Sequence, residues 1–289
     1  MTANVGDKVK HPKKADWGLG KVLEVTEADK VRVFFVHAGE KLLDMQYVQL
    51  QKVEGKEAEN YILDNPNLGK LVKDKEFKSL PQAHQDFKSL FPGGFNDPTY
   101  LENERDYKIE AHELLHELLG KEEFERLLEE GDYDEICSRA LKVVNKTNII
   151  FPNEKMALKD GLKPDDKKQM FAEVLYFHLY GDGTVEERFE RLARCLEELD
   201  AAKWTTATYF LFIGFPDEFP FMKPTVVQNV AKLVKVDIQY KSQLNWITFN
   251  SLLRFSQELQ RFLVEADMPP RDMIDVQSFM YCIAPGKYI

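Results

Sequence analysis

Residues 18–36 read GLGKVLEVTEADKVRVFFV, and this stretch decides the fold of the N-terminal region. Its two apolar runs, residues 22–26 and 31–36, show the two-residue alternation of β-strands, and turn-forming residues separate them. A further apolar run at residues 42–53 brings the total to about five short strands, which is enough for a small barrel. We therefore expect residues 1–55 to form a small all-β domain.

The same region carries three motifs that resemble a known family. They are GDKVKHP at residues 6–12, DWGLGKV at residues 16–22 and AGEK at residues 38–41. Together they resemble a bacterial Tudor-like domain of unknown function with an SH3-like barrel. Similar modules are appended to repair helicases and occur in transcription factors that grip RNA polymerase. The resemblance implies binding to protein or nucleic acid, and no chemistry.

The remainder of the chain has a helical pattern. From Glu57 onward the apolar side chains recur every three to four residues, for example at 133–144 and 185–199. Gly and Pro residues separate these segments, so we expect about ten helices of roughly 10 to 20 residues with short loops. Residues 56–80, rich in Lys, Glu and Asn, are expected to be a linker, and residues 81–289 a large all-α domain.

The charge of the 289-residue chain is unevenly distributed along the sequence. The net charge is −10. Residues 1–55 hold nine Lys and Arg and eight Asp and Glu, a balance of +1, whereas the remainder holds 30 and 41, a balance of −11. Because phosphate contacts supply most of the affinity for nucleic acid, an acidic body excludes a broad basic surface. Any nucleic-acid site must be a local patch.

The composition also limits the environment of the protein. No stretch approaches the ~20 consecutive apolar residues that cross a bilayer, and the N-terminus lacks the apolar core of a signal peptide. We therefore expect a cytoplasmic protein without membrane contact. Cys137, Cys195 and Cys282 are far apart and set among apolar residues. This pattern predicts buried free thiols, with neither a disulfide framework nor a metal site.

The segment His112-Glu113-Leu114-Leu115-His116 has the form H-E-x-x-H. On a helix the two imidazoles share one face and could bind zinc, with Glu113 as general base. A zinc-dependent hydrolase is therefore one hypothesis. Glu110 and Glu117, however, stand at flanking positions that such enzymes keep uncharged, and no third ligand is favoured over its acidic neighbours. We expect a surface helix without metal, and the sequence indicates no cofactor.

Lys8, Lys10, Lys13 and Lys14 form the densest basic cluster of the chain, and Trp17 follows closely. Cations beside an exposed aromatic ring suit phosphate contact combined with base stacking. The alternative is a solvated loop with Trp17 packed into the barrel. The first alternative predicts that these five residues bind nucleic acid.

The C-terminal third contains KWTTA at residues 203–207, FPF at 219–221, an amphipathic segment at 225–234 and PRD at 270–272. This order resembles the second half of the helix-hairpin-helix DNA glycosylases. In that family a glycine-rich hairpin grips one DNA strand. An aspartate on the next helix stabilises the positive charge that develops as the base leaves.

The chain departs from that family at the decisive positions. The hairpin glycines are absent before Thr205, and Met222 or Lys223 stands where the aspartate is expected. The negative charge would therefore have to come from elsewhere, with Asp272 and Asp275 as candidates. If neither serves, the resemblance implies a fold kept for binding without catalysis.

A second candidate pair lies in FPNEK at residues 151–155. Glu154 could act as an acid or base with Lys155 as its electrostatic partner. The alternative is ordinary helix capping and a salt bridge. The catalytic candidates are therefore Asp275, Asp272, Glu154 and Lys155. Lys203 and Lys223, in the glycosylase-like region, are added to the nucleic-acid-binding candidates.

These observations favour a DNA-binding protein whose glycosylase-like helical body excises or recognises a damaged or modified base, in repair or defence. Duplex DNA is the expected partner. The main rival is a non-catalytic adaptor that binds a protein partner through the barrel, and the zinc hydrolase comes third. Salt-dependent binding to duplex DNA separates the first two hypotheses, and metal content isolates the third.

Overall fold

The computed structural model describes residues 3–26, 29–73 and 76–288. The chain divides into two compact units. The first consists of Met1–Leu90, Gln228–Ile238 and Ile283–Ile289, and the second consists of Phe91–Val227 and Gln239–Cys282. Each unit therefore combines segments that are far apart in the sequence.

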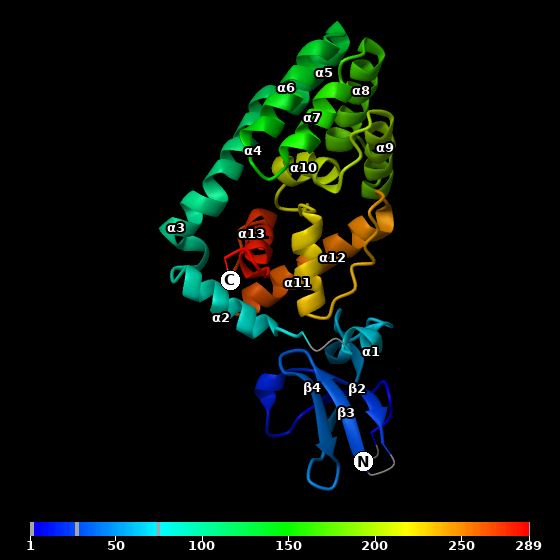
Figure 1. Ribbon diagram of the computed structural model, residues 1–289, viewed down its shortest axis with the longest axis vertical. Coiled ribbons are helices and arrows are strands. Elements are labelled where there is room, and N and C mark those ends of the chain that lie inside the picture. The colour runs from blue at the N-terminus through cyan, green and yellow to red at the C-terminus, as the bar shows by residue number, and fades with distance from the viewer. Residues whose placement is uncertain (1–2, 27–28, 74–75, 289) are drawn as a thin grey trace. The chain divides into compact units, whose positions relative to one another are not determined.

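Five strands form an antiparallel sheet in the first unit (Figure 1). They are β1 (Lys8–Lys10), β2 (Gly20–Val25), β3 (Lys30–Phe35), β4 (Gly39–Asp44) and β5 (Gln51–Val53), in the order β4-β3-β2-β1-β5. We call residues 8–53 the β domain. Alternate side chains such as Val22, Val33 and Phe35 are fully buried and make its core. The alternation in the sequence thus predicted the strands and their buried face.

Two glycines before β2 allow the chain to pass close to β3. Gly18 has φ +73°, in the left-handed region that favours glycine. A Cβ at Gly20 would lie 2.7 Å from the ring of Phe35, so a larger residue would displace the core. The Trp-Gly-x-Gly motif is therefore a requirement of the turn into β2.

Residues 56–80 were expected to be a linker, and the described part of this segment is packed. Ile62, Leu63 and Leu68 are buried. The segment holds a 3-10 turn at Gly55–Ala58 and the short helix α1 (Leu68–Leu71), and α2 (Leu80–Leu90) follows in the same unit. Its apolar residues stand in short runs between many Lys, Glu and Asn residues, without the period of a strand or a long helix, so the polar composition concealed them.

Helices α2 to α13, twelve in the described residues, follow the β domain along the chain, where the sequence predicted about ten. After α2 they are α3 (Pro98–Tyr100), α4 (Asp106–Leu119), α5 (Lys121–Glu130), α6 (Tyr133–Lys146), α7 (Pro152–Gly161), α8 (Asp165–Tyr180), α9 (Val185–Glu198), α10 (Trp204–Gly214), α11 (Pro224–Leu233), α12 (Trp246–Glu265) and α13 (Met273–Ile283). A π-helical turn, Leu101–Arg105, joins α3 to α4. The expected fold class, a small β domain followed by a large helical body, is confirmed.

Helix α10 is the core helix of the second unit. Every residue from Trp204 to Gly214 is buried, and the helix packs against α4, α7, α8 and α9. A helix that is apolar on all sides must be enclosed in this way. Tyr209, Phe210 and Phe212 are fully buried in this helix, and the three cysteines are buried and free as expected. In the described residues no helix is long and apolar enough to cross a membrane.

His178 on α8 is fully buried and makes stability depend on pH. Its Nδ1 lies 3.2 Å from the carbonyl oxygen of Arg188, to which it must donate because a carbonyl only accepts. Its Nε2 has no hydrogen-bond partner among the described residues. Burial lowers the pKa of His178 to about 3, so the ring is neutral in the folded protein.

We expect the free energy of unfolding to fall as the pH drops below about 6.5, the usual pKa of histidine in an unfolded chain. The folded pKa is depressed, so between this value and pH 3 the unfolded state binds a proton that the folded state does not. Because of His178, the free energy of unfolding should be about 2 kcal/mol lower at pH 5 than at pH 8. His178→Asn keeps a donor toward Arg188 but cannot titrate. The stability difference between variant and wild type should therefore shift by this amount between the two pH values, and a constant difference would contradict the assignment.

Candidate nucleic-acid interface

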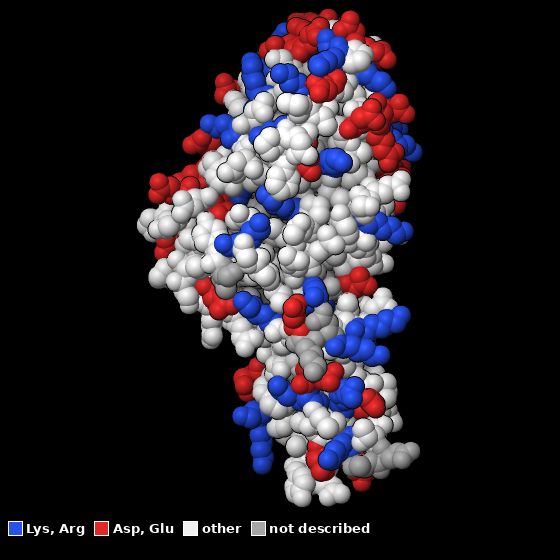
Figure 2. Space-filling model, in the orientation of Figure 1, with Lys and Arg blue, Asp and Glu red and all other residues white. Residues whose placement is uncertain are grey.

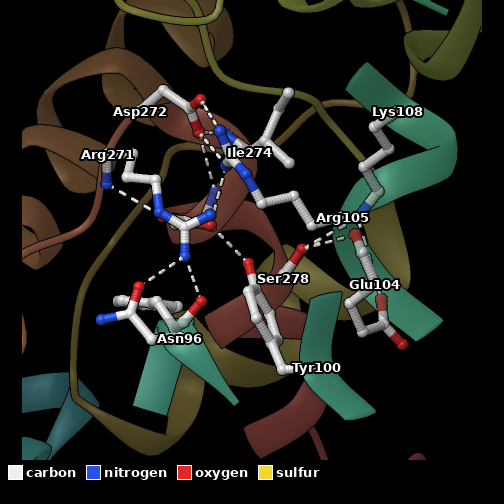
Figure 3. Close-up of polar contacts among 11 residues, drawn as sticks. Asn96, Tyr100, Glu104, Arg105, Lys108, Arg271, Asp272, Ile274 and Ser278 are labelled. Carbon is white, nitrogen blue, oxygen red and sulfur yellow. Dashed lines mark hydrogen bonds and ion pairs between the residues drawn. The ribbon is translucent and has the colours of Figure 1, made fainter. Parts of the chain in front are cut away.

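A buried network of charged side chains connects the π-helical turn before α4 to the start of α13 (Figure 3). The Arg105 guanidinium donates two hydrogen bonds to Asp272, at 2.8 and 2.6 Å, and one to Asp275, at 2.8 Å. The Arg105 and Asp272 side chains are each less than 10% exposed, and that of Asp275 is fully buried. One arginine thus holds both aspartates in the interior.

Two neighbours complete the hydrogen bonding of Asp275. The hydroxyl of Tyr100 donates to one carboxylate oxygen at 2.6 Å, and the backbone N–H of Arg271 donates to the other at 2.9 Å. The Arg271 guanidinium donates to the Phe95 carbonyl and to Asn96 (Figure 3), and its Nε lies 3.7 Å from Asp275 Oδ2. The lone pairs of Asp275 are therefore used inside the protein.

The electrostatics of this network stabilise the ion pairs. Burial opposes the charge of Arg105, but the hydrogen bonds that it donates to Asp272 and the charges of both aspartates raise its pKa. Burial and the charge of Asp275 raise the pKa of Tyr100, which remains a donor. The structure brings the two predicted catalytic aspartates together. Their pairing with Arg105 favours a structural role, because a paired and buried carboxylate is not presented to a substrate.

A second buried cation, Lys108, lies one turn along α4. Its Nζ donates to Ser278 Oγ at 2.8 Å and lies 3.7 Å from the Glu104 carboxylate (Figure 3). Burial lowers the pKa of Lys108 to about 8, against the charge of Glu104. π-Helical turns often occur beside functional sites, and this one carries Glu104 and Arg105. Sequence analysis missed Lys108, although it stands four and seven residues before His112 and Leu115 on the same helix.

The starts of α7 and α10 lie side by side. Glu154 accepts a hydrogen bond from the Phe151 N–H at 3.2 Å and caps α7. It also accepts one from the Thr205 hydroxyl, in the first turn of α10, at 2.8 Å. Glu154 therefore serves the capping role that was one of its two predicted alternatives, and it joins the two helix N-termini.

Lys223, immediately before α11, reaches the same region. Its Nζ lies 5.1 Å from the centroid of the Phe151 ring and 5.7 Å from that of Tyr281. Both distances are within the range of a cation–π contact. The Phe151 side chain is 53% exposed, so this aromatic ring and its cation lie at the surface.

Lys155 and Lys203 carry two further positive charges at these helix starts. Lys155 is half-buried and donates to the Thr147 carbonyl at 2.5 Å, and burial lowers its pKa. Lys203 is exposed at the N-cap of α10 and has no ion-pair partner among residues 3–26, 29–73 and 76–288. We call Lys155, Lys203, Lys223 and Phe151 the lysine surface. The positive ends of the helix dipoles add to its charge.

The acidic residues of the second unit gather elsewhere. Figure 2 shows many of them over α5 and α8, along α9 and beside α3, whereas the surface over α10 and α13 carries mainly uncharged side chains with few charged ones. The net negative charge of the body is therefore compatible with a local basic patch.

In the β domain, the predicted basic cluster is split between paired and unpaired lysines. Lys8 forms an ion pair with Asp64, and Lys10 lies 3.7 Å from Glu57. Lys13 and Lys14 are exposed and form no ion pair with any residue that the structure describes. The charge available to a phosphate is thus concentrated in the loop between β1 and β2.

Trp17 combines both of its predicted alternatives. Its ring is half-buried and packs edge-on against Phe35 of the core, with centroids 5.1 Å apart. The centroid of the His11 ring lies 4.9 Å from that of Trp17, and Lys41 Nζ lies 5.6 Å from the centroid of the Trp17 ring. The tryptophan thus anchors the loop while cations remain beside its accessible part.

Residues 4–53 match the model of a protein family of unknown function, DUF3553. The expected N-terminal domain of unknown function is thereby confirmed. The DUF3553 domain includes Lys8, Lys13 and Trp17, while the whole lysine surface lies outside the match. No curated protein and no solved structure matches the chain.

Outside the DUF3553 domain, the H-E-x-x-H segment lies on α4 and faces the end of α10. His112 Nδ1 lies 2.7 Å from the Ile213 carbonyl oxygen, and His116 Nε2 lies 2.9 Å from that of Gly214. Each imidazole must therefore donate a hydrogen bond to a backbone carbonyl at the C-terminus of α10. Side-chain donors commonly satisfy these last carbonyl groups, which have no partner within the helix. The described residues contain no group of three His, Cys, Asp or Glu side chains that could hold a metal ion.

Proposed function

We propose that this protein binds duplex DNA, with the lysine surface of the helical body as its principal contact. The observation that carries the proposal is the position of three lysines at helix starts in a chain of net charge −10. Lys155 and Lys203 lie at the starts of α7 and α10, which the Thr205 to Glu154 hydrogen bond joins, and Lys223 lies over the exposed Phe151 ring. Phosphate groups are recognised by lysines and helix N-termini, and bases by exposed aromatic rings.

Glu154 adds one negative charge to this surface. Its Oε2 accepts hydrogen bonds from the Phe151 N–H and from the Thr205 hydroxyl. One carboxylate beside three lysines leaves the lysine surface with a net positive charge, which favours phosphate. The loop of Lys13 and Lys14 in the DUF3553 domain provides a second, separate basic patch.

The test of this function is a titration of labelled duplex DNA with the full-length protein at low salt. We expect saturable binding that weakens as salt is raised. Absence of binding to any duplex at low salt would overturn the proposal and favour a protein-binding adaptor.

Base removal is the second candidate function. Residues 203–272 resemble the DNA glycosylases, and Glu154 is a carboxylate located on the lysine surface. Asp272 and Asp275 are paired with Arg105, which leaves Glu154 as the better-placed group to stabilise positive charge on a sugar.

If base removal occurs, we expect Glu154→Gln to abolish it while DNA binding persists. The glutamine can still cap α7, because Gln serves in a capping box as Glu does. The assay incubates duplexes carrying damaged or modified bases and detects alkali-labile abasic sites. Unchanged base release by Glu154→Gln would remove Glu154 from the chemistry, and absence of release from wild type would leave binding alone.

A further inference from the structure

Phe151 is an exposed aromatic residue whose backbone belongs to a helix start. It is the N-cap residue of α7 and its carbonyl accepts the N–H groups of Glu154 and Lys155, both at 3.0 Å. Pro152 follows at the first helical position and restricts the backbone. A phenylalanine side chain has only two rotatable bonds, so it loses little conformational entropy when a ligand covers it.

The surroundings of the ring define the chemistry of that ligand. Lys223 lies over it, and Lys155 is anchored one turn into α7 by the Thr147 carbonyl. Such a surface offers an apolar face to a flat group and positive charge to an anion attached to it. A purely apolar partner would not use the lysines, and an acidic peptide would not use the flat ring.

We propose that Phe151 stacks on an unpaired nucleobase while the neighbouring lysines contact the phosphates of the same strand. This inference rests on the proposed function and extends it by naming the base-contacting residue. Stacking on an aromatic side chain accepts any base, so the contact selects unstacked bases and not a sequence. A fully paired duplex would engage the lysines alone.

The test compares two short duplexes that differ at one position. One carries a single bulged thymine, and the other carries a bulged abasic residue with the same phosphates. Wild-type protein should prefer the bulged base by about fivefold to a hundredfold. Phe151→Ala should bind the two duplexes equally, whereas Phe151→Trp should retain the preference for the bulged base.

Met156 provides the matched control. It is 62% exposed on the same helix, so Met156→Ala removes a comparable apolar surface without removing an aromatic ring. The Met156→Ala variant should prefer the bulged base as strongly as the wild-type protein does. Equal binding of both duplexes by wild type, or a preference that survives Phe151→Ala, would overturn the stacking proposal alone. Failure to bind either duplex would overturn the proposed function with it.

Discussion

Replacing Arg105 by methionine is expected to lower the free energy of unfolding by about 3–5 kcal/mol, the usual cost of leaving a buried charge without its partner. The guanidinium supplies three hydrogen bonds to Asp272 and Asp275, which are buried in the second unit. Without it, two carboxylates face each other in an environment of low dielectric constant. Chemical denaturation at neutral pH measures the loss.

Two variants separate this effect from the removal of an arginine as such. Arg126→Met removes an exposed arginine that pairs with Glu123 and Glu130, and its effect should be much smaller because water screens these pairs. Replacing Arg105, Asp272 and Asp275 together by methionine and two asparagines should recover part of the loss, since no unpaired charge remains. An Arg105→Met variant as stable as Arg126→Met would contradict the structural role of the network.

Replacing Lys155, Lys203 and Lys223 together by glutamine is expected to weaken duplex binding at least tenfold at low salt. In the proposed function each lysine would contribute a phosphate contact, and the three lie at the starts of neighbouring helices. Fluorescence anisotropy of a labelled duplex measures the change, and thermal unfolding confirms that the variant is folded.

The matched control replaces Lys121, Lys163 and Arg261 by glutamine. These three cations are exposed or mostly exposed and lie outside the lysine surface, while the change in net charge is the same. Their loss should have little effect on affinity. Equal weakening by both triple variants would show that binding depends on overall charge, and the lysine surface would not be the contact.

The fold of the DUF3553 domain could be predicted because its determinants are local. Alternating residues such as Val31 and Val33 define the buried face of a strand, and Gly18 and Gly20 define the turn before β2. Both signals lie within a few residues of the structure they specify. The same is true of the apolar helix α10, whose composition alone requires that it be buried.

The charged network could not be predicted in the same way. Arg105 is 167 positions from Asp272 in the sequence, and nothing local connects them. Lys108 lies on the buried face of α4 with Ala111 and Leu115, where a periodicity analysis expects an apolar residue. Polar residues at core positions interrupt the pattern, so the sequence analysis considered the aspartates only as catalytic candidates.

The lysine surface was predictable only in part. Lys203 and Lys223 were identified from the glycosylase-like order, and Glu154 and Lys155 from their position at a helix start. Their proximity depends on how the starts of α7 and α10 meet, which the Glu154 and Thr205 hydrogen bond records. That contact joins residues 51 positions apart and has no signature in either segment.

The central claim is that the lysine surface contacts phosphates, and the dependence of duplex affinity on salt tests it most directly. For wild type and the Lys155, Lys203 and Lys223 triple variant, the logarithm of the association constant is plotted against the logarithm of salt concentration. Each of three phosphate contacts contributes about 0.9 to the magnitude of the slope. The slope for the triple variant should therefore be smaller in magnitude by about 2.7. Parallel lines for the two proteins, or affinity independent of salt in the wild type, would contradict the account.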